Sequence, residues 1–107
     1  MTDAVLAALS HEARRDMVLL LSVRGPVPTS VLTDRSDMTR QSATRHLEVL
    51  ESAGLVTSRR SGRQIVRELD LTPLLEMRTW MDTLAARWDE RLARLAATYA
   101  DPADEKA

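Results

Sequence analysis

Residues 39–56, TRQSATRHLEVLESAGLV, carry the pattern from which the fold can be inferred. Thr39 is a favourable N-cap, because its side-chain oxygen can accept a hydrogen bond from an unpaired backbone N–H of the first helical turn. A helix is therefore predicted over 40–53, and Gly54 ends it in the left-handed conformation that glycine adopts without strain. At about 100° per residue, one side of this helix is apolar and suited to burial. That stripe consists of Ala43, Leu47 and Leu50.

The opposite side of the predicted helix, near its N-terminus, is polar and presents Gln41, Thr44 and Arg45. In a major groove glutamine pairs with adenine and arginine with guanine, and threonine contacts a base or a thymine methyl group. A helix N-terminus also favours phosphate. This face suits a helix that reads duplex DNA, although an ordinary amphipathic surface helix would look much the same.

The segments before this helix are short and helical. The sequence predicts a helix over 3–9, a second from the N-cap Ser10 through Val23, and a third, short one capped by Thr29. The predicted connections are a tight Gly25-Pro26-Val27-Pro28 segment and a turn at Ser36-Asp37-Met38. A short helix and a turn in front of 40–53 are what a helix-turn-helix requires.

A β-hairpin is predicted after the helix, with strands over 55–60 and 63–69 on either side of Ser61-Gly62. Arginines gather at its tip, namely Arg59, Arg60 and Arg63. A two-stranded ribbon with a cationic tip can follow the DNA backbone or enter a narrow minor groove. The alternative is that these arginines only keep a strand edge soluble.

The formal net charge of −1 hides an uneven distribution. From 38 to 67, six arginines stand against two glutamates, which gives +4, whereas 101–107 carries three acids and one lysine, which gives −2. A local basic patch can bind nucleic acid, and a solvated charged face is the alternative. The aromatic residues all lie outside this patch, at Trp80, Trp88 and Tyr99. Because single strands are usually held on aromatic rings, duplex DNA is the better expectation.

A long final helix is predicted from the N-cap Thr72, with Pro73 at its first position, to about Tyr99. Its large apolar side chains share a stripe about 80° wide along a helix about 39 Å long. Because a small domain can cover only part of such a stripe, we expect the rest to pair with a second copy. The alternative is a helix that folds back along its own domain. The expected interface, with Trp80 at the edge of the stripe, comprises Leu74, Met77, Trp80, Met81, Leu84, Trp88, Leu92 and Leu95.

The composition excludes several classes of protein. A length of 107 residues predicts one domain, over 1–100, with a flexible acidic tail at 101–107. The lack of cysteine excludes disulfides and thiolate metal sites. No apolar run approaches the roughly 18 residues that span a bilayer, and the first residues lack the basic lead of a secretory signal. We therefore expect a cytoplasmic protein that does not engage membranes.

Catalysis is not expected. The triplet Ser10-His11-Glu12 could suggest a nucleophile and its base, but adjacent residues at the start of a helix point in different directions. No acid pair and no glycine-rich phosphate loop supports an enzyme.

Two stretches resemble the ArsR/SmtB-type winged helix-turn-helix repressors. Residues 9–18, LSHEARRDMV, look like that family's L-x-x-x-x-R-x-x-I-L opening, and 39–56 is similar to its more specific S-x-x-x-x-S-x-H-L-x-x-L-x-x-A-G-L-V signature. The resemblance covers roughly residues 5–100 and implies a homodimer that binds operator DNA, represses transcription and releases on a signal. It also implies that His46 helps to hold the recognition helix and contacts phosphate, and it places Thr44 where the family usually has serine.

The sequence departs from the metal sensors of that family, which use cysteines in the third helix or aspartate and histidine in the last. Here 29–34 has no cysteine, and the last helix has no histidine. Its carboxylates, such as Asp82, Asp89 and Glu90, fit a solvated face. We therefore expect no metal and no cofactor. An effector of unknown identity, or a partner, would instead act by repacking the stripe of the last helix.

The combined expectation is a mainly α protein with a small hairpin, a winged helix-turn-helix of order α-α-α-α-β-β-α that dimerises through its terminal helices. It would be a sequence-specific repressor with 39–53 in the major groove and 55–69 on the backbone or in the minor groove. The residues expected to contact DNA are Arg40, Gln41, Ser42, Thr44, Arg45, His46, Arg59, Arg60 and Arg63. The alternative is a winged-helix module whose arginines meet an acidic protein partner, without specific DNA binding.

Overall fold

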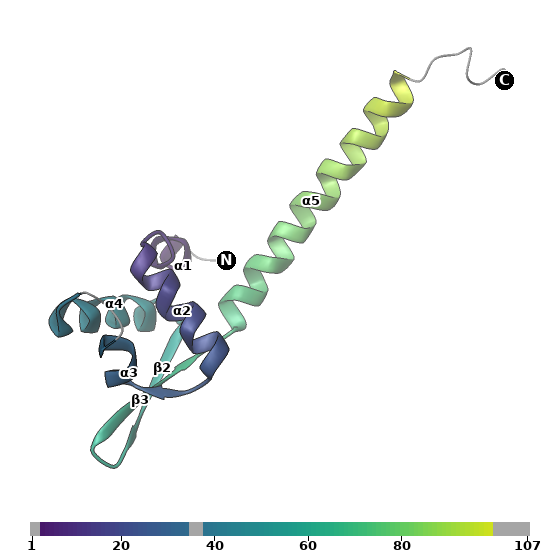
Figure 1. Ribbon diagram of the computed structural model, residues 1–107. Helices are drawn as coiled ribbons and strands as arrows, with labels where there is room; N and C mark the ends of the chain where they lie inside the picture. The colour runs from purple at the N-terminus through teal and green to yellow at the C-terminus, as the bar shows by residue number, and fades with distance from the viewer. Residues whose placement is uncertain (1–2, 35–37, 100–107) are drawn as a thin grey trace. The chain divides into compact units, whose positions relative to one another are not determined.

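The computed structural model describes residues 3–34 and 38–99 (Figure 1). The chain forms two units, which divide after Leu75. The elements in chain order are α1 (Asp3–Ala8), α2 (Glu12–Arg24), β1 (Val27–Pro28), α3 (Thr29–Asp34), α4 (Arg40–Ser52), β2 (Val56–Ser61), β3 (Gln64–Leu69) and α5 (Thr72–Thr98). Most of the turn predicted at Ser36-Asp37-Met38, and the acidic tail predicted at 101–107, lie outside the described residues.

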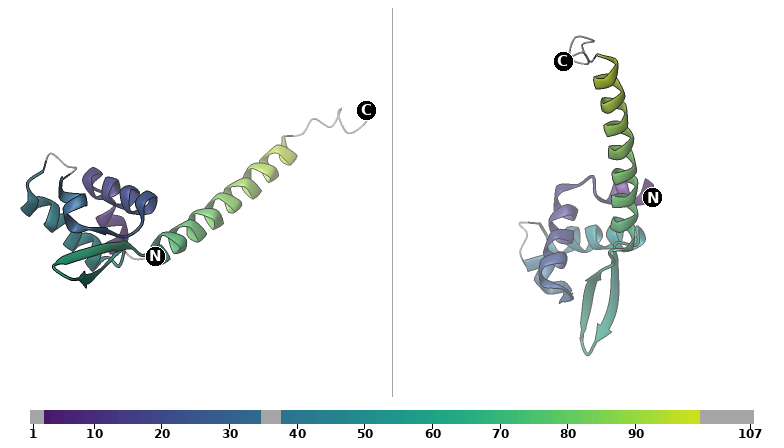
Figure 2. Two further views of the ribbon diagram at one scale, coloured as in Figure 1. Left: turned by 60° about the horizontal axis from the view of Figure 1, so that its bottom comes forward. Right: turned by 90° about the vertical axis from the view of Figure 1, so that its right-hand side faces the viewer.

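In the first unit, α1–α4 pack beside a small antiparallel sheet of order β1-β3-β2, and the tip of the β2–β3 hairpin projects beyond the helices (Figures 1 and 2). The expected mainly helical fold with a hairpin after the recognition helix is confirmed. The apolar stripe of α4 lies at its centre, with Ala43, Leu47 and Leu50 each fully buried. The rest of this core is formed by Val5, Ala8, Met17, Leu21, Val27, Leu32, Leu55, Val56 and Val66.

One strand was missed by the sequence analysis. The segment predicted as a tight connection contains β1, which pairs with β3 through Val27↔Arg67 and Pro28↔Val66. Proline is tolerated there because β1 is an edge strand, so no further strand requires its missing N–H. The glycine before it ends α2 as expected, since Gly25 has φ 77° and its N–H donates to Leu21 O.

Two predicted helix caps were wrong. Ser10 does not cap α2; its Oγ donates to Ala7 O, and His11 is the N-cap, with its Nδ1 accepting from Ala13 N at 3.1 Å. Thr72 does not precede α5 but is its first residue, and its N–H donates to Asp70 Oδ1 at 2.9 Å. This bond lowers the pKa of Asp70, since it stabilises the charged carboxylate.

The signals around α4 were correct. Thr39 caps the helix, with its Oγ1 accepting from Ser42 N at 3.1 Å, and Gly54 follows the helix with φ 81°. The hairpin is also present, but its turn is shifted by one residue from the prediction. The last strand pair is Ser61↔Gln64, so that Gly62 and Arg63 form the turn, and Gly62 takes the positive φ of 62°.

The second unit consists of the greater part of α5, drawn as one uninterrupted helix in Figure 2. None of the residues in α5 is buried. The stripe predicted for dimerisation is half-buried at Leu74 and Met77 and exposed from Trp80 to Leu95, with Trp80, Leu84 and Trp88 each more than half exposed. Among the described residues, no helix is both long and apolar enough to cross a membrane.

Loss of packing at α4 is expected to destabilise the first unit. The variant Leu50→Ala removes a fully buried side chain and should lower the free energy of unfolding by about 2–5 kcal/mol, as measured by urea denaturation. The exposed neighbour Glu48 provides the matched control, and Glu48→Ala should change the same quantity by less than about 0.5 kcal/mol. Equal effects of the two variants would contradict the position of α4 in the core.

Candidate nucleic-acid interface

The outer face of α4 is polar near its N-terminus. Gln41 and Arg45 are exposed and Thr44 is half-buried, while the buried stripe on the other side fixes the rotation of the helix about its axis. Arg40 is also exposed. Ser42 differs from these residues, because it is half-buried and its Oγ contacts Met38 Sδ at 3.8 Å. Its N–H donates to the capping oxygen of Thr39, so Ser42 lies in the first turn of α4 and is less accessible than Gln41 and Arg45.

The arginines of the hairpin are exposed but do not all point the same way. Side chains alternate along a strand, and directly opposed residues share a face. The register pairs Arg59 with Val66 and Arg60 with Ile65, so these two arginines lie on opposite faces of the hairpin. Arg63 stands in the turn itself. Arg60 Nε is 3.4 Å from Gly62 O, to which it donates, and this bond holds its guanidinium near the tip.

A groove of about 370 Å³ connects the recognition helix with the hairpin. It brings Thr44 of α4 and Arg63 of the turn onto one concave surface. Its lining consists of Pro28, Thr29, Ser30, Thr44, Arg63, Gln64, Ile65 and Arg67. Thr29 and Ser30 were not predicted as site residues, because only the tertiary pairing of β1 with β3 brings the start of α3 beside the hairpin. Gln64, in the hairpin itself, was not predicted because it carries no charge.

His46 joins α4 to the start of α2. Its Nδ1 is 3.1 Å from Arg14 Nη1, and its ring centroid is 4.5 Å from that of His11. Because a guanidinium can only donate, Nδ1 must accept, and the ring is neutral with its proton on Nε2. The pKa of His46 is lowered by burial and then by the nearby charges of His11, Arg14 and Arg45. His46 therefore contributes a neutral contact that holds α4 in place.

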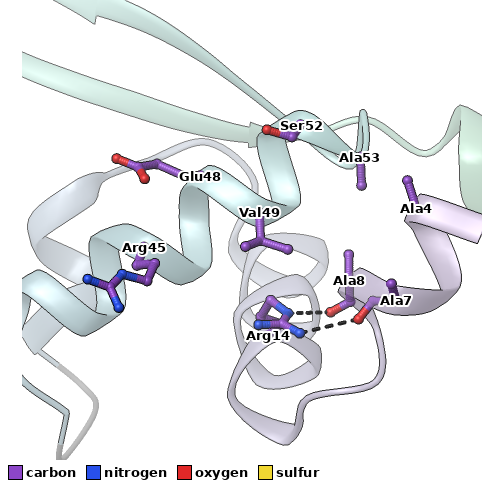
Figure 3. A pocket seen from close by; sticks show the side chains of 9 residues that line it. All are labelled: Ala4, Ala7, Ala8, Arg14, Arg45, Glu48, Val49, Ser52 and Ala53. Atoms are coloured by element: carbon purple, nitrogen blue, oxygen red, sulfur yellow. Dashed lines mark hydrogen bonds between the residues drawn. The ribbon is translucent and has the colours of Figure 1, made fainter.

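Arg14 connects the same contact to α1. Its Nε donates to Ala8 O at 2.6 Å and its Nη2 to Ala7 O at 3.2 Å, so that it satisfies carbonyls at the end of α1 that have no partner within the helix. Figure 3 shows these two bonds beside a hollow of about 500 Å³ between α1 and α4. Arg14 was not singled out from the sequence; the one available signal was its place as the arginine of the L-x-x-x-x-R opening.

The basic patch keeps its charge after folding. Arg67 pairs with Glu51, with 3.1 Å between Nη1 and Oε2, which removes one arginine and one glutamate from the segment 38–67. Five arginines then stand against Glu48, so the net charge of the unpaired groups is still +4. In the part of the chain that the structure describes, no three histidine, cysteine, aspartate or glutamate side chains gather as a metal site.

Comparison with known proteins gives consistent matches. A model of the helix-turn-helix domain matches residues 9–59. The chain is 37% identical over 87 residues to YuzN, an uncharacterized HTH-type transcriptional regulator of Bacillus subtilis, with 75% of this chain and 95% of YuzN covered. An ArsR-like transcriptional regulator from Rhodococcus sp. RHA1 is 32% identical, with a TM-score of 0.77 and 92% of each chain covered.

A solved structure from Mycobacterium bovis shares the fold. It is the homodimeric winged helix-turn-helix DNA-binding domain of Mb0332, described as a possible ArsR-family transcriptional regulator. It is 23% identical to this chain, with a TM-score of 0.62, and the match covers 82% of this chain and 81% of that one.

Acid should weaken the first unit through His46. Because folding lowers its pKa, the unfolded state binds more protons, and the free energy of unfolding decreases as the pH falls through the unfolded-state pKa near 6.5. The loss ends below the lowered folded-state pKa. The variant His46→Gln keeps an acceptor for Arg14 but does not titrate. Urea denaturation at several pH values between about 7.5 and 5.5 should show a smaller decrease for this variant than for the wild type. His11 is present in both proteins, so identical pH dependence would contradict this assignment.

Proposed function

The chain belongs to the ArsR-type winged helix-turn-helix transcriptional regulators, and on this basis we propose that it is a homodimeric repressor which binds a specific DNA operator. Members of this family are DNA-binding regulators and not enzymes. In our proposal α4 enters the major groove, where Gln41, Thr44 and Arg45 read base edges. The hairpin lies on the adjacent backbone or minor groove, with Arg59, Arg60 and Arg63 near phosphate.

One observation carries this proposal, namely the groove that joins Thr44 to Arg63. A helix inside a major groove has the sugar-phosphate backbone along both of its sides. In this arrangement, a cationic turn that shares a concave surface with the outer face of α4 would lie where one of these backbones passes. The net charge of +4 on the unpaired groups of this region supports the same partner, because phosphate neutralisation supplies much of the affinity for DNA.

The homodimer is supported by the exposed stripe of α5. Its apolar side chains follow the predicted helical spacing, and Trp80, Met81, Leu84, Trp88, Leu92 and Leu95 are all between 42% and 56% exposed. An apolar surface this long marks an interaction site on a soluble protein. The homodimeric state of Mb0332 agrees with pairing between two copies. Two recognition helices held about 34 Å apart would read successive major grooves.

Repression and its release complete the proposal. A dimer seated on its operator would block transcription, and an effector or partner that repacks the α5 stripe would change the separation of the two recognition helices. Such a regulator would act in the cytoplasm, where the DNA is accessible to it. We expect no metal in this step.

The decisive experiment is selection of bound fragments from a random pool of duplex DNA with the purified full chain. We expect a two-fold symmetric consensus, binding that survives excess random DNA, and an affinity that falls steeply with rising salt. Failure to enrich any sequence would contradict the operator-binding proposal. Salt-sensitive binding without sequence preference would instead favour the protein-interaction module, whose arginines meet an acidic partner.

Arg45 and Arg63 should have different roles at the selected operator. Arg45→Ala should cost about 1–3 kcal/mol of binding free energy and relax the preference at one base position. Arg63→Ala should weaken binding to operator and random DNA by the same factor and reduce the slope of log affinity against log salt by about 1. Both are measured by fluorescence anisotropy at several salt concentrations. If both variants lose affinity independently of sequence, the base-reading role of Arg45 is wrong.

A charge in the α5 stripe should separate the two copies. Leu84→Asp places a carboxylate among apolar side chains, and sedimentation equilibrium should show a monomer with reduced operator affinity. Ala86→Asp adds the same charge on the opposite side of the helix and should leave the dimer intact. A dimer that persists in Leu84→Asp, with unchanged affinity for the operator, would show that the stripe is not the interface.

A further inference from the structure

Arg67 is the one charged side chain that is buried among the described residues, with 7% of its surface exposed. In the sequence Arg67 belongs to the basic segment of the hairpin, yet its guanidinium lies away from the other arginines at the tip. It lies on β3, the central strand, where the register places it between Val27 of β1 and Ser58 of β2. Its side chain therefore projects from the root of the hairpin, where the hairpin joins the body of the first unit.

The guanidinium of Arg67 bonds to three other elements. Its Nε donates to Thr29 Oγ1 of α3 at 3.0 Å. Its Nη1 donates to Ser58 Oγ of β2 at 2.8 Å and to Glu51 Oε2 of α4 at 3.1 Å. The planar guanidinium holds its N–H groups at fixed angles, so these bonds define directions as well as distances.

Each neutral partner of Arg67 is itself fixed by a second bond. Ser58 Oγ donates to Glu51 Oε2 at 3.3 Å, and Thr29 Oγ1 donates to the backbone oxygen of Ile65 at 3.0 Å. The network therefore closes on itself and leaves no buried side-chain polar atom unsatisfied among the described residues. It connects the last turn of α4 to both strands of the hairpin and to the start of α3.

Because this network lies near the base of the hairpin, a small change of angle there produces a larger displacement of the tip. From Ser58 to Gly62 the strand is about four residues long, or ~13 Å at ~3.3 Å per residue, so a tilt of about 10° at the root moves the tip by about 2 Å. A shift of that size is enough to break the hydrogen bond of an arginine to a phosphate, which forms only over a narrow range of distances. The angle between the hairpin and α4 therefore decides whether both can contact one DNA duplex.

We propose that Arg67 is a positioning residue for DNA binding, which fixes the hairpin at the angle to α4 that brings Arg63 onto the backbone of the DNA that α4 reads. Arg67 itself does not contact DNA in this arrangement. The inference rests on the proposed function, since it needs α4 and the hairpin to bind the same duplex. It adds a residue that neither the charge pattern nor the recognition-helix signature identifies.

The test is a double-mutant cycle between Arg67 and Arg63, with affinity for the selected operator measured at several salt concentrations. Arg67→Met keeps most of the side-chain length and removes every bond of the network. If Arg67 positions the hairpin, Arg63→Ala should reduce affinity by a much smaller factor in the Arg67→Met protein than in the wild type. Arg67→Met alone should lower the salt slope by at least about 1, as loss of the phosphate contact does, and keep the preference for operator over random DNA.

A purely structural role predicts a different result. Arg67→Met would then lower the melting temperature, but at a temperature where both proteins are folded Arg63→Ala would reduce affinity by the same factor in each. That outcome overturns the inference and leaves the proposed function intact. If Arg63→Ala has no effect on the wild type, the DNA contact of the hairpin is wrong, and the positioning role is overturned with it.

Milder variants keep the inference testable should Arg67→Met fail to fold. Ser58→Ala removes one acceptor, and Glu51→Gln removes the charge while it keeps an oxygen that can accept from Arg67. Each should reduce the effect of Arg63→Ala by part of the amount expected for Arg67→Met. Strict additivity of both with Arg63→Ala would overturn the inference. Glu68→Gln, at the exposed neighbouring position on β3, is the matched control and should be additive.

Discussion

The complete burial of Ala43, Leu47 and Leu50 is the constraint on which the rest of the structure depends. A helix that buries one stripe has no freedom to rotate about its axis, so the side chains half a turn away must face outward. This packing alone aims Gln41 and Arg45 away from the protein. The contact of His46 with Arg14 and the bond of Arg67 to Glu51 then hold the middle and the last turn of α4 against neighbouring elements. The packing of the core therefore determines which side chains of α4 are available at the candidate interface.

Much of the fold could be predicted because its signals are local. Thr39 and Gly54 mark the ends of α4 within a few residues of the helix itself, and the 3.6-residue period identifies its buried stripe. The missed strand and the missed buried charge involve residues distant in sequence, whereas the misplaced helix caps and the shifted hairpin turn are errors of one residue in local signals. Pro28 becomes part of a strand only because β3 lies beside it, and the burial of Arg67 depends on partners in three other elements. Sequence reasoning counted Arg67 as surface charge because no pattern within the hairpin reveals Glu51 as its partner.

The candidate site also has a part that depends on local signals and a part that depends on contacts between distant segments. The outward polar face of α4, which we propose reads bases, could be predicted, since all its residues lie within two turns of one helix. The groove that contains Thr44 and Arg63 could not, since it requires the start of α3 to meet the hairpin. The α5 stripe is intermediate. The helix that carries it was predicted from spacing, whereas the second copy that we propose to cover it cannot be inferred from one chain alone. An apolar face of this length gains stability only when it is removed from water.

The bonds of Arg14 have a consequence for α1, one of the two six-residue helices among the described residues. Six residues are too few for an α-helix to persist in water by itself, so α1 stays wound only while its neighbours hold it. One guanidinium both secures the last carbonyls of α1 and donates to His46 on α4. If α1 unwound, Arg14 would lose its bonds to the carbonyls of Ala7 and Ala8. Its guanidinium would then be free to move, and its contact with His46 of α4 would be weakened. The two events are mechanically linked, although nearly forty positions separate α1 from His46 along the chain.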